Sequence, residues 1–167
     1  RTPAEVLEGR LGTCLDTTLT MAAVLEQAGI NSTLWMLKGH AFLGYWRNDS
    51  ALSMVSTTEV IDVVNQVDLG NIGLVETTMV TQSALDAKFD DAIRSPRVKH
   101  LHDDLTNIIG ITDIRQAREA RIFPLPSRAV DAQGNVVVTT YTPNAGRTIA
   151  PYVAGPGQYR ESNGDAV

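Results

Sequence analysis

The chain has 167 residues, of which 43% are hydrophobic, and its formal net charge is −5 at pH 7. This length and composition are typical of one soluble globular domain with a sizeable core. The acidic balance argues against a general nucleic-acid binder, which needs a basic face. No apolar run approaches the roughly 18 residues that a membrane span needs, so we expect neither membrane insertion nor direct nucleic-acid binding.

The start of the chain and its cysteine content bear on its origin. The first residue is Arg1 rather than Met, and no signal-peptide pattern follows, so we expect a segment of a longer protein. Cys14 is the single cysteine, which excludes an internal disulfide and favours a cytoplasmic location.

The first predicted element is a short helix in the run TPAEVLEG. Thr2 can cap it, Pro3 suits its first turn, and Glu5 has the spacing of a capping box with Thr2. Gly9 is expected to end it.

The second predicted helix begins at Cys14 and continues to Ala28, with no glycine or proline inside, and Gly29 fits its C-terminal stop. Its apolar residues cover most of its circumference: Leu15, Leu19, Met21, Ala22, Ala23, Val24, Leu25 and Ala28. This distribution predicts a central, buried helix.

Strand-forming residues dominate the next part of the chain. Residues 31–37 and 40–46 read as two strands separated by Lys38-Gly39, and residues 71–81 read as a third. Between them, residues 59–67 are ambiguous between helix and strand. An order of helix followed by strands with short connections predicts an α+β fold, with the Cys14 helix packed on an antiparallel sheet.

The C-terminal half is predicted to hold two more helices and one more strand. A helix is expected from Ser83 to Ser95, where Pro96 interrupts it, and a short one over residues 112–122. A strand is expected over residues 135–143. We therefore expect one domain over residues 1–142, and a Pro/Gly-rich loop or linker over residues 143–167.

Cys14 is a candidate nucleophile because it follows a Gly-Thr step where a helix begins. Unpaired N–H groups at a helix N-terminus favour the thiolate, which is the reactive form of cysteine. The same N–H groups could bind a developing oxyanion. The alternative is a small buried side chain with no reactivity, which is common for a free cysteine.

A thiolate enzyme also needs a base, and His40 opens a predicted strand directly after Gly39. A strand is a rigid mount that can hold an imidazole against a helix end; the alternative is an ordinary half-buried histidine. His100 and His102 lie in the charged run RVKHLHDDL, where solvation or pairing with neighbouring aspartates is the expected role.

The third requirement is an acid that orients the histidine. Glu76 stands among apolar and hydroxyl residues in GLVETTMV, and a carboxylate there is costly to bury unless it is paired. Glu76 is therefore the leading candidate, with Asp62 and Asp68 as rivals. We expect the sulfur of Cys14 to approach one ring nitrogen of His40, and Glu76 to reach the other.

Taken together, the runs LGTCLDTTLTMAAVLEQAGI, GHAFLGYW and GLVETTMV resemble the transglutaminase-like superfamily, the papain-related thiol fold. The resemblance implies a nucleophile at Cys14, a base at His40 and an acid at Glu76. It also implies a structural carboxylate at Asp16, in the first turn of the helix. The chain departs from the family pattern at the third position, where Glu-Thr-Thr replaces Asp-Pro-Thr.

With the added run DIRQAREARIFPLP, residues 1–127 resemble the transglutaminase-like segment of large bacterial helicase-related proteins of superfamily 1. This implies a fused helicase-type ATPase region outside the chain, since no Walker-type phosphate loop occurs within it. The expected activity is thiol-dependent acyl transfer or amide and peptide hydrolysis on a protein or peptide, with no cofactor and no metal. The alternative is a catalytically silent peptide-binding or structural module.

Overall fold

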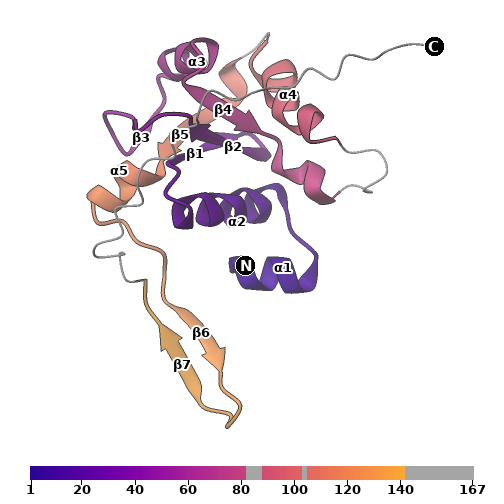
Figure 1. The fold of residues 1–167 in the computed structure, drawn as a ribbon, viewed down its shortest axis with the longest axis vertical. Coiled ribbons are helices and arrows are strands. Elements are labelled where there is room, and N and C mark those ends of the chain that lie inside the picture. The colour runs from indigo at the N-terminus through magenta and orange to yellow at the C-terminus, as the bar shows by residue number, and fades with distance from the viewer. Residues whose placement is uncertain (82–87, 103–104, 142–167) are drawn as a thin grey trace, which may run out of the picture.

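The computed structural model describes residues 1–81, 88–102 and 105–141, and the predicted tail of residues 143–167 lies outside these ranges. The fold is α+β, with a five-stranded sheet in the order β3-β5-β1-β2-β4 in which every neighbouring pair is antiparallel. Helices lie on both faces of this sheet (Figure 1). Its strands are β1 (Ser32–Leu37), β2 (His40–Trp46), β3 (Ser56–Thr57), β4 (Ile72–Val75) and β5 (Ile108–Asp113).

Helices α1 (Pro3–Gly9) and α2 (Cys14–Gln27) both begin at capping boxes. The sequence predicts the first of these boxes and not the second. In α1 the Thr2 hydroxyl accepts from the Glu5 N–H, while the Glu5 carboxylate accepts from the Thr2 N–H. In α2, Thr13 and Asp16 exchange the same two bonds. These bonds satisfy N–H groups that have no acceptor inside the helix.

Helix α2 is buried on one face only, which corrects the prediction of a central helix with little of its surface in contact with water. It lies between the sheet and α1 (Figure 1), and its buried residues are Thr17, Thr18, Thr20 and Ala22. Leu15 and Leu19 are each 40% exposed, and Val24 is 59% exposed. The Thr18 hydroxyl donates to the Ala41 carbonyl of β2, so this side of α2 faces the sheet and the leucine-bearing side is left outward.

Strands β1 and β2 form the hairpin that the sequence predicts. Lys38 and Gly39 make the turn, and Gly39 has a φ of 77°, a left-handed conformation that glycine adopts without strain. Trp35 lies opposite Phe42, and their rings stack with centroids 5.4 Å apart.

The main hydrophobic core lies between the sheet and α3 (Val60–Asp68), a helix where the sequence was ambiguous. Side chains from β1, β2, β4 and β5 meet one face of α3, as expected for alternating strand positions. The core members are Trp35, Leu37, Phe42, Trp46, Val60, Val63, Val67, Ile72, Leu74, Ile108 and Ile111. None of the helices in the described ranges combines the length and apolar character that a bilayer crossing requires.

The predicted third strand is shorter than expected. Strand β4 ends at Val75, and a 3₁₀ helix, η1 (Thr77–Thr81), follows Glu76. The Glu76 side chain accepts hydrogen bonds from the N–H and the hydroxyl of Thr78, and the Met79 N–H points back to the Glu76 carbonyl. These local bonds turn the chain away from the sheet directly after Glu76.

Helix α4 (Phe89–His100) continues through Pro96, so the prediction that it ends at Ser95 is wrong. Residues 83–87 of that predicted helix lie outside the described ranges. A proline inside a helix has no N–H for the carbonyl four residues earlier, here that of Ala92. The Ala92 carbonyl instead accepts the backbone N–H of Glu76 at 2.8 Å. The group that Pro96 leaves unpaired is therefore satisfied, and the same bond fixes α4 to the end of β4.

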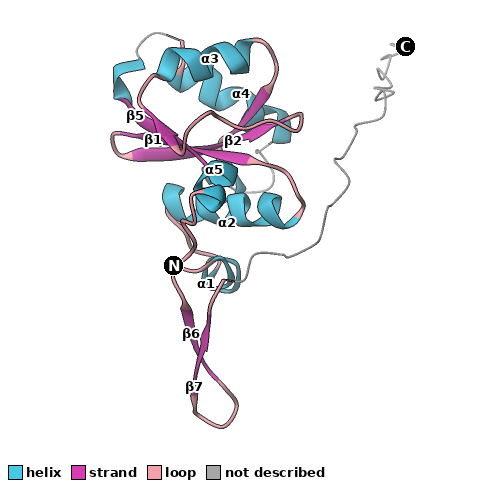
Figure 2. Ribbon diagram, turned by 90° about the vertical axis from the view of Figure 1, so that its left-hand side faces the viewer, coloured by secondary structure: helices cyan, strands magenta, loops and turns pink. Residues whose placement is uncertain are grey.

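The C-terminal elements end in a hairpin. After η2 (Leu105–Asn107) and β5, the short helix α5 (Ile114–Glu119) is capped by Asp113. The last predicted strand is present as β7 (Val136–Thr139), paired with β6 (Ser127–Val130), which the sequence analysis did not predict. Figure 2 shows this hairpin extending away from the five-stranded sheet.

Candidate functional site

His40 and Glu76 form a hydrogen-bonded pair at one end of the sheet. His40 is the first residue of β2, and Glu76 directly follows β4, the neighbouring antiparallel strand. The Nε2 atom of His40 and the Oε2 atom of Glu76 lie 2.8 Å apart. The expected contact between these two side chains is therefore present, and it leaves the Nδ1 atom of His40 available to another partner.

Glu76 is held as an oriented carboxylate. It is only 4% exposed, and its second oxygen, Oε1, accepts from the Thr78 N–H at 3.2 Å and the Thr78 hydroxyl at 2.7 Å. Burial raises the pKa of Glu76, but the hydrogen bonds from Thr78 and His40 together outweigh it and bring the pKa below the ordinary value. Glu76 is thus ionised at neutral pH, as an acid that orients an imidazole should be.

His100 lies beside this pair, which the sequence analysis did not foresee. It is the last residue of α4, and its Nε2 atom lies 4.0 Å from Oε2 of Glu76. Its ring is 5.2 Å from the ring of His40 and stacks on Phe42 at 5.5 Å with an interplanar angle of 15°. Burial lowers the pKa of His100, and the neighbouring His40 lowers it further.

The expectation of a solvated His100 fails because α4 does not stop at Ser95. Only a helix that continues past Pro96 carries His100 back to the end of β4. Asp103 and Asp104, the other partners considered for it, lie outside the described residues. No local pattern in the sequence marks His100, since its position depends on the bond between Ala92 and Glu76.

Cys14 is a free, partly buried thiol at the first position of α2. Thr17 and Thr18 follow it by three and four residues, which places all three on one face of the helix. Both threonine hydroxyls lie 2.9 Å from the Thr77 hydroxyl, and the Thr18 hydroxyl also donates to the carbonyl of Ala41. Helix α2 is therefore fixed, one turn from Cys14, to the residues next to Glu76 and His40.

The thiol and the imidazole are not hydrogen-bonded. Within the described ranges, the Sγ atom of Cys14 has no hydrogen-bond partner within 4.0 Å, and the ring of His40 is bonded to Glu76. Alternation along β2 places His40 on the same side of the sheet as Phe42, toward α4, while α2 packs on the other face. A direct Cys14–His40 pair therefore requires a rearrangement at this end of the sheet.

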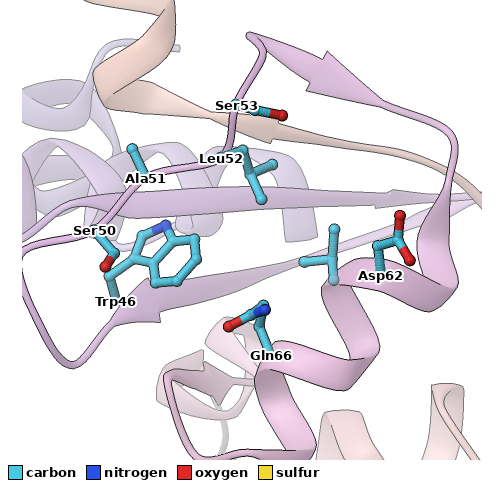
Figure 3. A pocket seen from close by; sticks show the side chains of 8 residues that line it. Trp46, Ser50, Ala51, Leu52, Ser53, Asp62 and Gln66 are labelled. Atoms are coloured by element: carbon cyan, nitrogen blue, oxygen red, sulfur yellow. The ribbon is translucent and has the colours of Figure 1, made fainter.

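The rival acids lie elsewhere. Asp68 pairs with Arg97 at 2.6 Å, and both side chains are more than half exposed. Asp62, on α3, lines a separate pocket beside Trp46 and Gln66 (Figure 3). Of the three candidate acids, Glu76 is the one in contact with His40.

A cavity of about 250 Å³ opens at the His40–Glu76 pair. It is lined by His40, Glu76, Thr78, Met79, Lys99 and His100. The pair can accept or return a proton at the free nitrogen of His40. The cluster of His40, Glu76 and His100 also brings one potential metal-ligand atom from each residue within 4.8 Å of the others.

Comparison with known proteins adds no assignment to this geometry. No family model, curated protein or solved structure matches the chain.

Proposed function

We propose that this chain is a cysteine-dependent acyl-transfer or amide-hydrolysing domain of the transglutaminase-like type. In this proposal Cys14 is the nucleophile, His40 the base and Glu76 the residue that orients His40. The observation that carries it is the 2.8 Å bond between His40 and a buried, ionised Glu76. A carboxylate on one ring nitrogen fixes the tautomer and stabilises the imidazolium that forms when the other nitrogen takes a proton.

The proposed reaction begins when a rearrangement at this end of the sheet brings Nδ1 of His40 to the Cys14 thiol. The imidazole then takes the thiol proton, and the thiolate attacks an amide carbonyl. The amine then leaves with the proton from His40, and the acyl group remains on sulfur as a thioester. Attack on the thioester by water releases the acyl group as a carboxylic acid, which is hydrolysis. Attack by a second amine transfers the acyl group to that amine. The N–H groups of Cys14 and Leu15 have no acceptor within α2, so they can bind the oxyanion that forms.

One observation favours a second candidate, a catalytically silent peptide-binding module. The Cys14 thiol forms no hydrogen bond with His40, and α2, which begins at Cys14, packs on the face of the sheet opposite to the one that carries the His40 side chain. A module that only binds peptide needs the cavity beside His40 and Glu76 but not the thiol. Thiol reactivity separates the two functions.

The proposal extends to the setting of the domain. The run from Asp113 to Pro126 is part of residues 1–127, which together resemble the transglutaminase-like segment of bacterial helicase-related proteins. We therefore propose a cytoplasmic parent protein with a helicase-type ATPase region, whose substrate for this domain is a protein or peptide. The acidic net charge of −5 supports a protein substrate over direct contact with nucleic acid.

The test is the pH dependence of iodoacetamide alkylation at Cys14 in the unaltered chain and in His40→Ala. A thiol activated by His40 reacts well below the pH of about 8.5 at which an ordinary thiol ionises. His40→Ala should lose that low-pH reactivity, while the control His102→Ala should retain it. An alkylation profile that is the same in all three proteins would leave the silent binding module standing.

A further inference from the structure

We propose that His40, Glu76 and His100 form a binding site for a divalent transition-metal ion, with Zn²⁺ as the best match. Their ligand atoms come from three elements, the start of β2, the residue after β4 and the end of α4. All three atoms lie within 4.8 Å of one another. The sequence predicts no metal site, and this inference holds whether or not Cys14 is a nucleophile.

The ligand set matches Zn²⁺ in type and number. Zinc takes imidazole nitrogen and carboxylate oxygen, and sites with three protein ligands keep a fourth position for water. Mg²⁺ and Ca²⁺ prefer all-oxygen ligands, so two imidazoles disfavour them. The adjoining cavity of about 250 Å³ gives the fourth position access to solvent.

The separations need only small side-chain rotations to fit. At metal–ligand distances of about 2.0–2.2 Å, the ligands of a tetrahedral ion lie about 3.3–3.6 Å apart. The present separations are 2.8 Å between His40 and Glu76, and 4.0 Å between His100 and Glu76. Binding would lengthen the first and shorten the second. The hydrogen now shared with Glu76 would leave Nε2 of His40, and the neutral imidazole would carry its hydrogen on Nδ1 instead.

The surroundings of the cluster support a cation. The Oε1 atom of Glu76 is already fixed by Thr78, as the outer partners of metal ligands usually are. His100 is the last residue of a 12-residue helix, where the helix dipole favours positive charge. Phe42 packs on the His100 ring and limits its rotation.

Of the described residues that line this cavity, Lys99 is the one that opposes a cation. It lines the cavity next to His100, but it is exposed, so water screens its charge and its long side chain can turn outward. The buried carboxylate of Glu76 lies 2.8 Å from the His40 nitrogen and 4.0 Å from the His100 nitrogen, and its attraction for the ion is the larger effect.

The test is titration of the full chain with Zn²⁺ by calorimetry and with Co²⁺ by visible absorption. We expect one ion per chain and the visible bands of four-coordinate Co²⁺, with no sulfur-to-metal charge-transfer band in the near ultraviolet. His100→Gln should weaken binding at least about tenfold, since even outer partners of metal ligands are worth 10–100-fold. His102→Gln and Cys14→Ser should bind as the unaltered chain does, and Mg²⁺ should not compete.

Binding that is no tighter than millimolar, or that weakens equally in His102→Gln, would overturn the proposal. A strong sulfur-to-cobalt band, abolished by Cys14→Ser, would place the ion at the thiol instead. The spectrum of the unaltered chain decides this even if His100→Gln does not fold. None of these readings measures thiol reactivity, so failure of the metal site and failure of the proposed enzyme function are distinguishable.

Discussion

Thr18 and Thr77 are joined in the core by hydroxyl oxygens 2.9 Å apart, which ties helix α2 to the residue directly after Glu76. Thr77 is fully buried, and its hydroxyl lies equally close to that of Thr17. A single side chain thus connects the helix that begins at Cys14 with the segment that carries Glu76. The relative placement of thiol and carboxylate depends on this contact.

Replacing Thr77 with valine should destabilise the fold by about 1–3 kcal/mol, because it removes both buried hydrogen bonds while keeping the side-chain shape. Unfolding in urea measures the loss. Thr112→Val is the matched control, since the Thr112 hydroxyl makes an exposed contact with Ser56, and its effect should stay within about 0.5 kcal/mol. Equal losses in the two variants would contradict a special role for Thr77.

The features that the sequence predicts are those that depend on neighbouring residues. Thr2 and Glu5 cap α1 within one turn, and Gly39 closes the β1–β2 hairpin. The pairing of His40 with Glu76 was also expected, because a carboxylate flanked by apolar and hydroxyl residues needs a partner. The cap and the hairpin turn follow from the chemistry of a short run, whereas the pairing was expected from the need of His40 for an acid.

The features that the sequence analysis missed depend on contacts between distant residues. Helix α4 passes Pro96 because the Ala92 carbonyl finds the Glu76 N–H, and this brings His100 to the site. The side chain of Glu76 ends β4 by bonding Thr78. Strand β5 went unpredicted although Ile108, Ile109 and Ile111 are β-formers, and it pairs with β1 far back in the chain.

Asp113 is a buried hub, and replacing it with alanine should cost about 3–5 kcal/mol. It is fully buried and accepts hydrogen bonds from the Asn31 amide, the Trp46 indole and the Leu52 and Gln116 N–H groups. Removing the carboxylate leaves these donors without that acceptor in the core.

Denaturant unfolding with Asp49→Ala as the control tests the role of Asp113. Asp49 is largely exposed and pairs with Arg115 at 2.6 Å, and such surface pairs contribute about 0–1 kcal/mol. If Asp113→Ala lost no more stability than Asp49→Ala, Asp113 would not be a structural hub.

The capping box of α2 should make stability depend on acid pH. Hydrogen bonds from the N–H and the hydroxyl of Thr13 lower the pKa of Asp16. A carboxyl group with a lowered pKa stabilises the fold above its unfolded value of about 3.9, and the contribution disappears as the pH falls through the folded value. Asp16→Asn should therefore be less stable than the unaltered chain at pH 7, and the difference should shrink by pH 3.

Urea unfolding at the two pH values measures this difference. Asp62→Asn is the control, because Asp62 holds the same third position in α3 but the N-cap of that helix has no side-chain hydrogen bond. A stability difference for Asp16→Asn that is unchanged between pH 7 and pH 3 would show that its charge does not stabilise the helix start.

If both proposals hold, Zn²⁺ should slow the alkylation of Cys14, because the ion engages the imidazole that activates the thiol. Positioned bases contribute about 10²–10⁴-fold to rates, so saturating Zn²⁺ should slow alkylation near neutral pH at least about tenfold. The ratio of rate constants with and without Zn²⁺ is the measured quantity.

Zinc could also protect Cys14 by binding its sulfur directly, and His100→Gln separates the two effects. His100 takes part in the cluster, whose ligand atoms lie within 4.8 Å of one another, and that cluster does not include Cys14. Protection by Zn²⁺ that is lost in His100→Gln but retained in His102→Gln therefore places the ion at His40, Glu76 and His100. If both variants retain the protection, the ion binds the sulfur of Cys14.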